Sequence, residues 1–128
     1  MRSHLALALP ALILVAAQPA ATPTKVTLTG WIACDRCSPA RLKAARMGPV
    51  NRDCAQRCIA EGAKVVLIDE GARRLLKVTN PEATKGQESH YVRLTGLLDA
   101  SAKALQVTSV TVLEEYVASC GRVPPEKQ

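Results

Sequence analysis

The sequence contains no phenylalanine and few aromatic side chains of any kind. Its 128 residues include one Trp and two Tyr, and aromatic residues make up 2% of the chain. An apolar core must therefore be built from Val, Leu, Ile and Ala. Domains that bind single-stranded nucleic acid without sequence preference stack the bases on aromatic rings. The scarcity of rings argues against nucleic acid as a partner.

Histidine is also scarce, since the chain has only His4 and His90. We expect His90 to open a strand at an exposed polar position. The sequence shows no Ser–His–Asp set, no pair of inward-facing carboxylates and no glycine-rich phosphate loop, so acid–base catalysis has few candidate residues. The sequence therefore predicts no catalytic residue and no cofactor.

Only one long apolar run occurs, near the N-terminus, from Leu5 to Ala17. A helix of this length spans about 20 Å, which is short of the roughly 30 Å hydrocarbon core of a bilayer. The run follows the basic residue Arg2 and ends in small residues, as cleavable secretory signal peptides do. We predict a signal peptide over residues 1–17, with cleavage near Ala20–Ala21 as the alternative, and a flexible leader over residues 18–24. The protein is then exported, periplasmic or secreted, with no transmembrane span after cleavage.

Hydrophobic periodicity predicts five strands in the rest of the chain. Apolar and β-branched residues alternate with period two in five segments, at residues 25–33, 64–68, 73–79, 90–98 and 104–114. In the first segment, Val26, Leu28 and Ile32 form one face. Trp31 lies on the opposite face, where we expect it to pack beneath a helical insert.

Capping signals predict two short helices between the first and second strands, within residues 38–62. Ser38 can cap the first helix, with Pro39 at its first helical position. Asp53 can cap the second helix, which Gly62 ends. A further single helical turn is expected between the third and fourth strands.

Interruptions within the strands indicate that the sheet closes on itself. Gly30 and Gly96 interrupt the first and fourth strands, and the apolar phase of the fifth slips by one residue near Ser109, as at a β-bulge. Closing a small barrel requires such bends. We predict a mainly β fold, a small five-stranded OB-fold-like barrel with a two-helix insert between strands 1 and 2. This single domain covers residues 25–120, and a disordered tail covers residues 121–128.

Four motifs run along the predicted domain: Gly30-Trp31-Ile32…Cys37, Asp53-Cys54…Cys58, Gly62-Ala63-Lys64 and Val92-x-Leu94-x-Gly96. They resemble the pattern of a family of small exported bacterial proteins predicted to be OB-like, over roughly residues 26–113. The resemblance implies an exported OB-like domain and brings no established activity with it. Family members have an Asp shortly after the Trp-Ile step and one cysteine before the insert, whereas this chain has Cys34 at that earlier place, followed by Asp35. Cys120 lies outside the resemblance, and we hypothesise that these two extra cysteines pair with each other.

The cysteines are the residues best suited to carry chemistry. Four of them form the pattern Cys34-x2-Cys37-x16-Cys54-x3-Cys58, and Cys120 follows near the C-terminus. In an exported protein we expect disulfides that staple the helices to the barrel. Closing a loop of about 15 residues contributes roughly 3 kcal/mol in the chain-entropy model. The pairing stays open, because four cysteines allow three connectivities.

Two other uses of the thiols stay open. Cys34, Cys37, Cys54 and Cys58 match the two ligand pairs of a tetrahedral four-cysteine metal site, although three residues rather than two separate the second pair. Oxidation after export would compete with such a site. Cys34-Asp35-Arg36-Cys37 is also a CxxC motif, in which Arg36 and a helix N-terminus would favour a reactive thiolate. No βαβ pattern surrounds this motif.

Positive charge is concentrated in one segment of a chain whose net charge is +6 at pH 7. Residues 36–57, which we call the basic segment, hold one acidic residue, Asp53, against Arg36, Arg41, Lys43, Arg46, Arg52 and Arg57. The segment is a candidate surface for an anionic ligand, with a solvated helix face as the plainer interpretation. The sequence predicts an exported, disulfide-stapled, non-catalytic binding or structural module of unknown ligand. A thiol–disulfide redox protein that uses Cys34 and Cys37 is the alternative.

Overall fold

The computed structural model describes residues 21–44 and 48–116. In chain order the elements are β1 (Thr24–Cys34), α1 (Ser38–Lys43), α2 (Arg52–Ala60), β2 (Val65–Asp69), β3 (Arg74–Val78), the 3₁₀ turn η1 (Pro81–Thr84), β4 (Tyr91–Asp99) and β5 (Ala104–Glu114). Each strand begins within one residue of its predicted start, and the two helices lie between β1 and β2 as expected. The predictions for the signal peptide, for Arg46 and Cys120, and for the tail lie outside the described residues.

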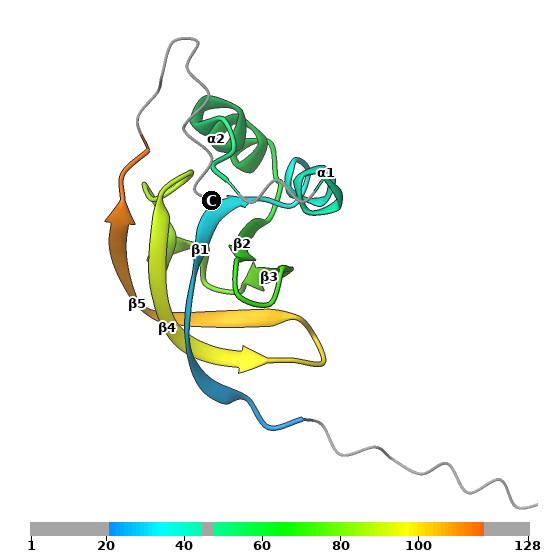
Figure 1. Cartoon of the computed structure of the whole chain (residues 1–128), viewed down its shortest axis with the longest axis vertical. Coiled ribbons are helices and arrows are strands. Elements are labelled where there is room, and N and C mark those ends of the chain that lie inside the picture. The colour runs from blue at the N-terminus through cyan, green and yellow to red at the C-terminus, as the bar shows by residue number, and fades with distance from the viewer. Residues whose placement is uncertain (1–20, 45–47, 117–128) are drawn as a thin grey trace, which may run out of the picture.

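The five strands form one mixed sheet that closes in a ring. Their order is β1-β2-β3-β5-β4, and β4 pairs again with β1. Only β3 and β5 are parallel, and they join through two residue pairs. The strongly curved β1 pairs with β4 over Thr24–Trp31 and with β2 over Gly30–Cys34 (Figure 1). The prediction of a mainly β, five-stranded closed sheet with a helical insert is therefore confirmed.

Two glycines stand where neighbouring backbones approach most closely. A Cβ atom on Gly30 would lie 1.9 Å from the carbonyl oxygen of Ile68, and one on Gly96 would lie 2.2 Å from that of Gln106. Gly30 is the position at which β1 passes from one pairing partner to the other. Because Gly30 has no side chain, β1 can approach β2 closely there and pair with both β2 and β4, which closes the ring.

The predicted bulge in the fifth strand is present. Thr95 pairs with Ser109, but the next residue of β4, Gly96, pairs with Val107, so Thr108 is the extra residue of β5. A bulge of this kind increases the local twist of a sheet. The bulge bends β5 at the place where the apolar phase of the sequence slips.

Apolar side chains form two clusters on opposite faces of β1 and β2. The inner cluster fills the ring and consists of Ile32, Val65, Leu67, Leu76, Val78, Val92, Leu94, Leu98, Leu105 and Val107. The outer cluster lies between the sheet and the insert and consists of Ala33, Val50, Ala55, Val66 and Ile68, with Trp31, Cys37 and Leu75 packed against it. The expected positions of Ile32 inside and Trp31 outside, beneath the helices, are confirmed.

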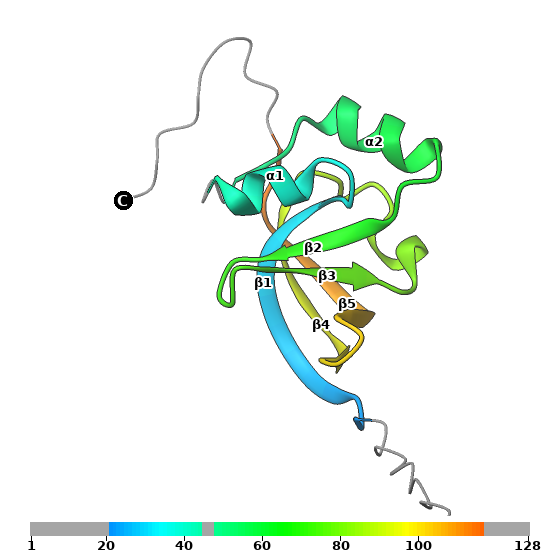
Figure 2. The same ribbon diagram turned by 90° about the vertical axis from the view of Figure 1, so that its right-hand side faces the viewer.

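The two helices lie together at one end of the ring (Figure 2), but their first residues differ from the prediction. Cys37 caps α1, and Ser38 is instead buried in its first turn. Asn51 caps α2, because its side-chain oxygen accepts a hydrogen bond from the backbone N–H of Cys54 at 2.9 Å. Asp53, the predicted cap, lies in the first turn. Asn and Asp are equally good caps. Gln56 lies three residues after Asp53, as in a capping box, so the sequence pattern favoured Asp53 over Asn51.

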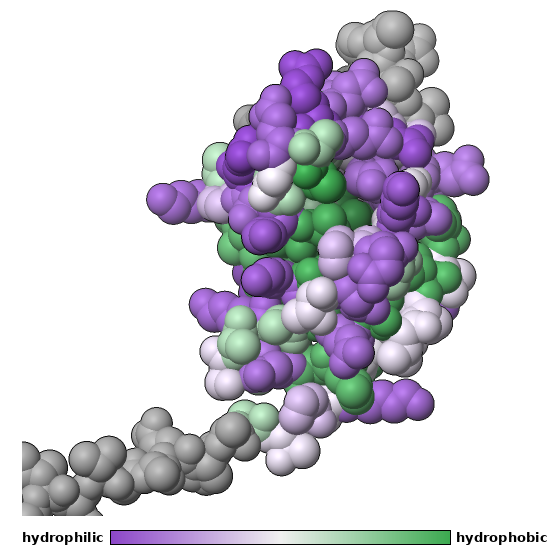
Figure 3. Space-filling model, turned by 180° about the vertical axis from the view of Figure 1, so that it is seen from behind, coloured by the Kyte–Doolittle hydropathy of each residue, from purple (hydrophilic) through white to green (hydrophobic). Residues whose placement is uncertain are grey.

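Polar side chains cover most of the face opposite to that of Figure 1, and apolar side chains are visible in its middle (Figure 3). The large apolar residues exposed on the described surface are Leu97, Val112 and Leu113, all on β4 and β5. Within the part of the chain that the structure describes, no helix is both long and apolar enough to cross a membrane.

Candidate functional site

The structure brings four cysteines together where the ring meets the helices. Cys34 is the last residue of β1, Cys37 caps α1, and Cys54 and Cys58 lie one turn apart on α2. The Sγ atoms of Cys34, Cys37 and Cys58 all lie within 4.8 Å of one another. The Sγ atoms of Cys37 and Cys54 lie 3.8 Å apart. We call these four residues the cysteine cluster.

Hydrogen bonds fix the turn that carries the first two cysteines. The buried Ser38 donates from Oγ to the carbonyl oxygen of Cys34 at 2.6 Å. The backbone N–H of Asp35 donates to the carbonyl oxygen of Lys64 at 2.9 Å, and Asp35 Oδ1 accepts from the N–H of Lys64 at 3.1 Å. Because Lys64 directly precedes β2, the turn is tied to two neighbouring strands.

The end of α2 is tied to the same turn. Arg36 Nη1 lies 3.1 Å from Glu61 Oε2 in an ion pair, and Arg36 Nη2 donates to the carbonyl oxygen of Glu61 at 3.4 Å. The carbonyl oxygen of Cys58 accepts from the N–H of Ala63 at 2.9 Å, next to Gly62 with φ +100°. The ion pair is solvent-exposed and contributes only about 0–1 kcal/mol, so it orients α2 more than it stabilises the fold.

Exposure differs sharply between the four thiols. Cys34 is fully buried, Cys37 and Cys58 are half-buried, and Cys54 is exposed. All four are free thiols, with no two of these sulfurs at bonding distance. The structure thus places the four cysteines in contact without a disulfide between them.

The surroundings of the cluster do not favour thiol–disulfide exchange. Burial raises the pKa of Cys37 to about 12, and the neighbouring thiols of Cys34 and Cys54 add to this rise. Burial also raises the pKa of Cys58, with the charge of Cys34 as the next contribution. A thiol that attacks disulfides needs a pKa close to ambient pH. The raised pKa of Cys37 therefore counts against this residue as the attacking thiol of the CxxC motif.

Three residues of the basic segment interact with the protein itself. Arg36 is paired with Glu61, as described above. Arg41 donates to the carbonyl oxygen of Gly48 at 3.4 Å. Arg52 donates to the carbonyl oxygen of Gly86 at 3.0 Å and so joins α2 to the loop before β4. These guanidinium groups help to hold the insert in place.

The other basic residues are spread over the insert. Lys43 lies in the last turn of α1 and Arg57 in the last turn of α2. Arg46 lies outside the described residues. Anion binding by the basic segment therefore stays a prediction.

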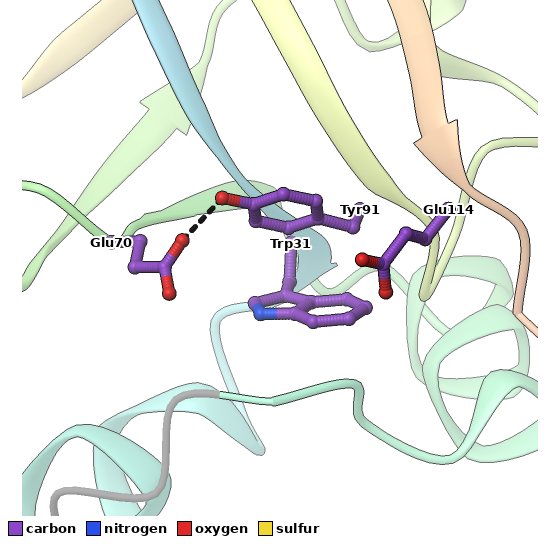
Figure 4. Close-up of a pocket in the computed structure, with 4 residues that line it drawn as sticks. All are labelled: Trp31, Glu70, Tyr91 and Glu114. Atoms are coloured by element: carbon purple, nitrogen blue, oxygen red, sulfur yellow. Dashed lines mark hydrogen bonds between the residues drawn. The ribbon is translucent and has the colours of Figure 1, made fainter. Parts of the chain in front are cut away.

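Sequence reasoning missed a small pocket outside the ring, lined by Trp31, Glu70, Tyr91 and Glu114 (Figure 4). The centroids of the Trp31 and Tyr91 rings lie 4.9 Å apart, with the ring planes tilted by 46°. The hydroxyl of Tyr91 donates a hydrogen bond to the carboxylate of Glu70. Trp31 and Tyr91 are direct partners across β1 and β4, so only the strand pairing could have revealed the pocket.

His90 is buried, which contradicts its predicted exposed position. It is 8% exposed, and its Nδ1 accepts a hydrogen bond from the backbone N–H of Tyr116 at 2.6 Å. Its carbonyl oxygen accepts from the N–H of Ile32 at 3.2 Å. The segment after β5 covers this side chain, a non-local contact that no local pattern indicates. His90 therefore joins the end of β5 to the ring.

The fold and the cluster together define a small, mainly β domain that carries four thiols at its helical insert. Comparisons with protein-family models, with curated proteins and with solved structures find no match to this chain. The geometry of the cysteine cluster is therefore the basis for a proposed function.

Proposed function

We propose that the protein is an exported, non-catalytic OB-like module whose functional centre is the cysteine cluster, a site for a thiophilic divalent cation such as zinc. One observation carries the proposal. The sulfur of Cys37 has the sulfurs of Cys34, Cys54 and Cys58 as neighbours at the same time. Soft thiolate ligands select zinc and related metals over magnesium or calcium.

The sulfur separations approach those of a tetrahedral thiolate site, with Cys54 meeting the other three through Cys37. Zinc–sulfur bonds of about 2.3 Å in a tetrahedron place neighbouring sulfurs about 3.8 Å apart. The Sγ atoms of Cys37 and Cys54 have this separation, 3.8 Å, and the Sγ atoms of Cys34, Cys37 and Cys58 lie within 4.8 Å of one another. A disulfide joins sulfurs in pairs at about 2.05 Å, and it does not require one sulfur to lie beside three others.

The topology supports the OB-like part of the proposal. Three features support assignment to the five-stranded Greek-key barrels of this class: the strand order β1-β2-β3-β5-β4, the parallel pair β3–β5 and the η1 turn between β3 and β4. OB-folds use the loop between strands 1 and 2 for binding. In this chain that loop is the helical insert, and the cysteine cluster lies at its base.

Disulfide stapling is the second candidate, and the sulfur contacts favour one pairing. Cys37 contacts Cys54, which leaves Cys34 to pair with Cys58, its neighbour in the group of three. An oxidising compartment favours this chemistry. The insert would then be held by two covalent bonds and would contain no metal.

Metal analysis combined with thiol mapping separates the two candidates. The chain is exported from a bacterial host by its own leader and purified without chelator, and zinc is measured per chain. We expect one zinc per chain and four cysteines that react with an alkylating reagent only after the metal is removed. Cobalt substitution should give the charge-transfer and tetrahedral d–d absorption of a cobalt–thiolate site. Zinc-free protein with the bonds Cys37–Cys54 and Cys34–Cys58 would overturn the metal site in favour of stapling.

A further inference from the structure

The four sulfurs of the cysteine cluster are not equivalent. Cys34, Cys37 and Cys58 form the group in which every pair of sulfurs lies within 4.8 Å, and Cys54 stands outside that group while contacting Cys37. The exposed fraction follows the same division, since Cys54 alone among the four is classed as exposed. The cluster therefore has three inner ligands and one outer ligand.

We infer that the metal site opens at Cys54, which a thiol-bearing acceptor displaces, while the three inner sulfurs hold the ion until the acceptor takes it. This inference rests on the proposed metal site and deepens it. Zinc sites with three protein ligands and one exchangeable position are the ones at which new ligands bind. The acceptor is defined by its chemistry as a thiolate donor that reaches the solvent-facing side of the cluster.

The inner ligands are held by the ring and by the turn that is tied to it. Cys34 ends β1, is 0% exposed, and has its carbonyl oxygen bonded to Ser38. Cys58 is joined through its carbonyl oxygen to Ala63, which leads into β2. These links restrict the movement of the inner sulfurs when the fourth ligand leaves.

The outer ligand lies in the first turn of a helix that the core holds weakly. Cys54 belongs to α2, in which Ala55 is the buried residue. Arg57 lies three residues after Cys54, on the same face of the helix. Its positive charge favours the approach of an anionic thiolate to the metal. The described surroundings of Cys54 thus combine solvent access with attraction for the incoming ligand.

The exchange step is a ligand substitution without electron transfer. The metal–Sγ bond of Cys54 breaks as a metal–sulfur bond to the acceptor forms. The acceptor thiol gives up its proton before it binds as a thiolate, and the released Cys54 thiolate takes up a proton from water, so the protons balance. The metal stays divalent throughout, so the step needs no oxidant or reductant.

Zinc transfer from the full-length protein to a chromogenic chelator, with glutathione as the thiol, tests the inference. In the wild type, the transfer rate should rise with glutathione concentration. Cys54→Ser should still bind one zinc and should transfer it faster, with little dependence on glutathione. Cys34→Ser should lose at least about one order of magnitude more zinc affinity than Cys54→Ser, since removal of supporting groups alone costs 10–100-fold at metal sites. Cys58→Ser provides the same comparison if Cys34→Ser fails to fold, which circular dichroism checks.

The possible negative results distinguish a failure of this inference from a failure of the proposed metal site. Equal loss of zinc in Cys54→Ser and in the inner-ligand variants would overturn the inference, as would a wild-type transfer rate that is independent of glutathione. A wild-type chain that binds no zinc at all would instead overturn the proposed metal site itself.

Discussion

The Sγ atoms of Cys37 and Cys54 lie 3.8 Å apart, although 17 positions separate the two residues in the sequence. The contact joins the cap of α1 to the first turn of α2. Few side chains of these helices are fully buried: Ser38 in α1 and Ala55 in α2, with Ile59 of α2 partly buried against the inner cluster. The sulfur contacts of the cysteine cluster therefore add to the packing and hydrogen bonds that hold the helical insert on the ring.

Removal of the metal should loosen the insert and leave the ring folded. We expect chelation to abolish the hydrogen-exchange protection of α1 and α2 amides while those of β1, β2 and β4 stay protected, because the buried residues of the inner apolar cluster all lie on strands. The zinc-bound protein should gain stability by about 4 kcal/mol when free zinc is 1,000 times its dissociation constant. Thermal melting with and without chelator measures this gain. Equal loss of protection in helices and strands would contradict the account.

The apolar interior of the ring should dominate its stability. Leu94 is fully buried in the inner cluster, whereas Leu97 on the same strand is 39% exposed. We expect Leu94→Ala to lower the free energy of unfolding by about 2–5 kcal/mol. The matched variant Leu97→Ala should cost less than about 1 kcal/mol, because it leaves no cavity. Denaturant titration compares the two, and similar losses would show that the inner cluster is misassigned.

Gly30 should be intolerant of any side chain. A Cβ there would meet the carbonyl oxygen of Ile68 at 1.9 Å, so β1 and β2 would have to separate. We expect Gly30→Ala to destabilise the protein by about 1–3 kcal/mol, as overpacking does. Gly48→Ala is the control, since a Cβ at Gly48 would have nothing within 4 Å. If both variants melt at the wild-type temperature, the close approach of β1 and β2 is wrong.

Tyr91 should titrate above the ordinary range of tyrosine. Burial raises its pKa, and the hydrogen bond to Glu70 acts in the same direction. The neutral phenol is favoured in the folded state, so its stabilising contribution is present below the ordinary pKa of about 10. That contribution is lost as the pH rises through the raised pKa.

Phenolate absorbance in a Tyr116→Phe background, where Tyr91 is the remaining tyrosine, measures this titration. Glu70→Gln removes the neighbouring charge, so the pKa of Tyr91 should fall toward its ordinary value. Glu82→Gln, in the η1 turn, is the control and should leave the titration unchanged. An unchanged pKa in Glu70→Gln would show that the hydrogen bond does not contribute.

The ring could be predicted from the sequence because its signals are local. Period-two alternation placed each strand, and Gly30, Gly96 and the phase slip near Ser109 marked the bends that close the sheet. Each of these features depends on a residue and its immediate neighbours. A closed β-sheet with a helical insert could therefore be inferred without any tertiary information.

The candidate site could be predicted only in part. The spacing identified the two cysteine pairs, but it left open which sulfurs meet, because that depends on how α2 packs against the end of β1. The burial of His90 was missed for the same reason, since the segment that ends at Tyr116 covers it. The Trp31–Tyr91 contact likewise depends on the pairing of β1 with β4. Spacing along the chain identifies residues capable of chemistry, and tertiary packing determines which of them meet.

Native mass spectrometry of the exported wild-type chain is the most direct test of the central claim that four sulfurs share one metal ion. The account predicts a folded species that carries one zinc and loses it, together with its protection against alkylation, when chelator is added. A folded, metal-free species in which Cys34, Cys37, Cys54 and Cys58 are oxidised to two disulfides would contradict the claim.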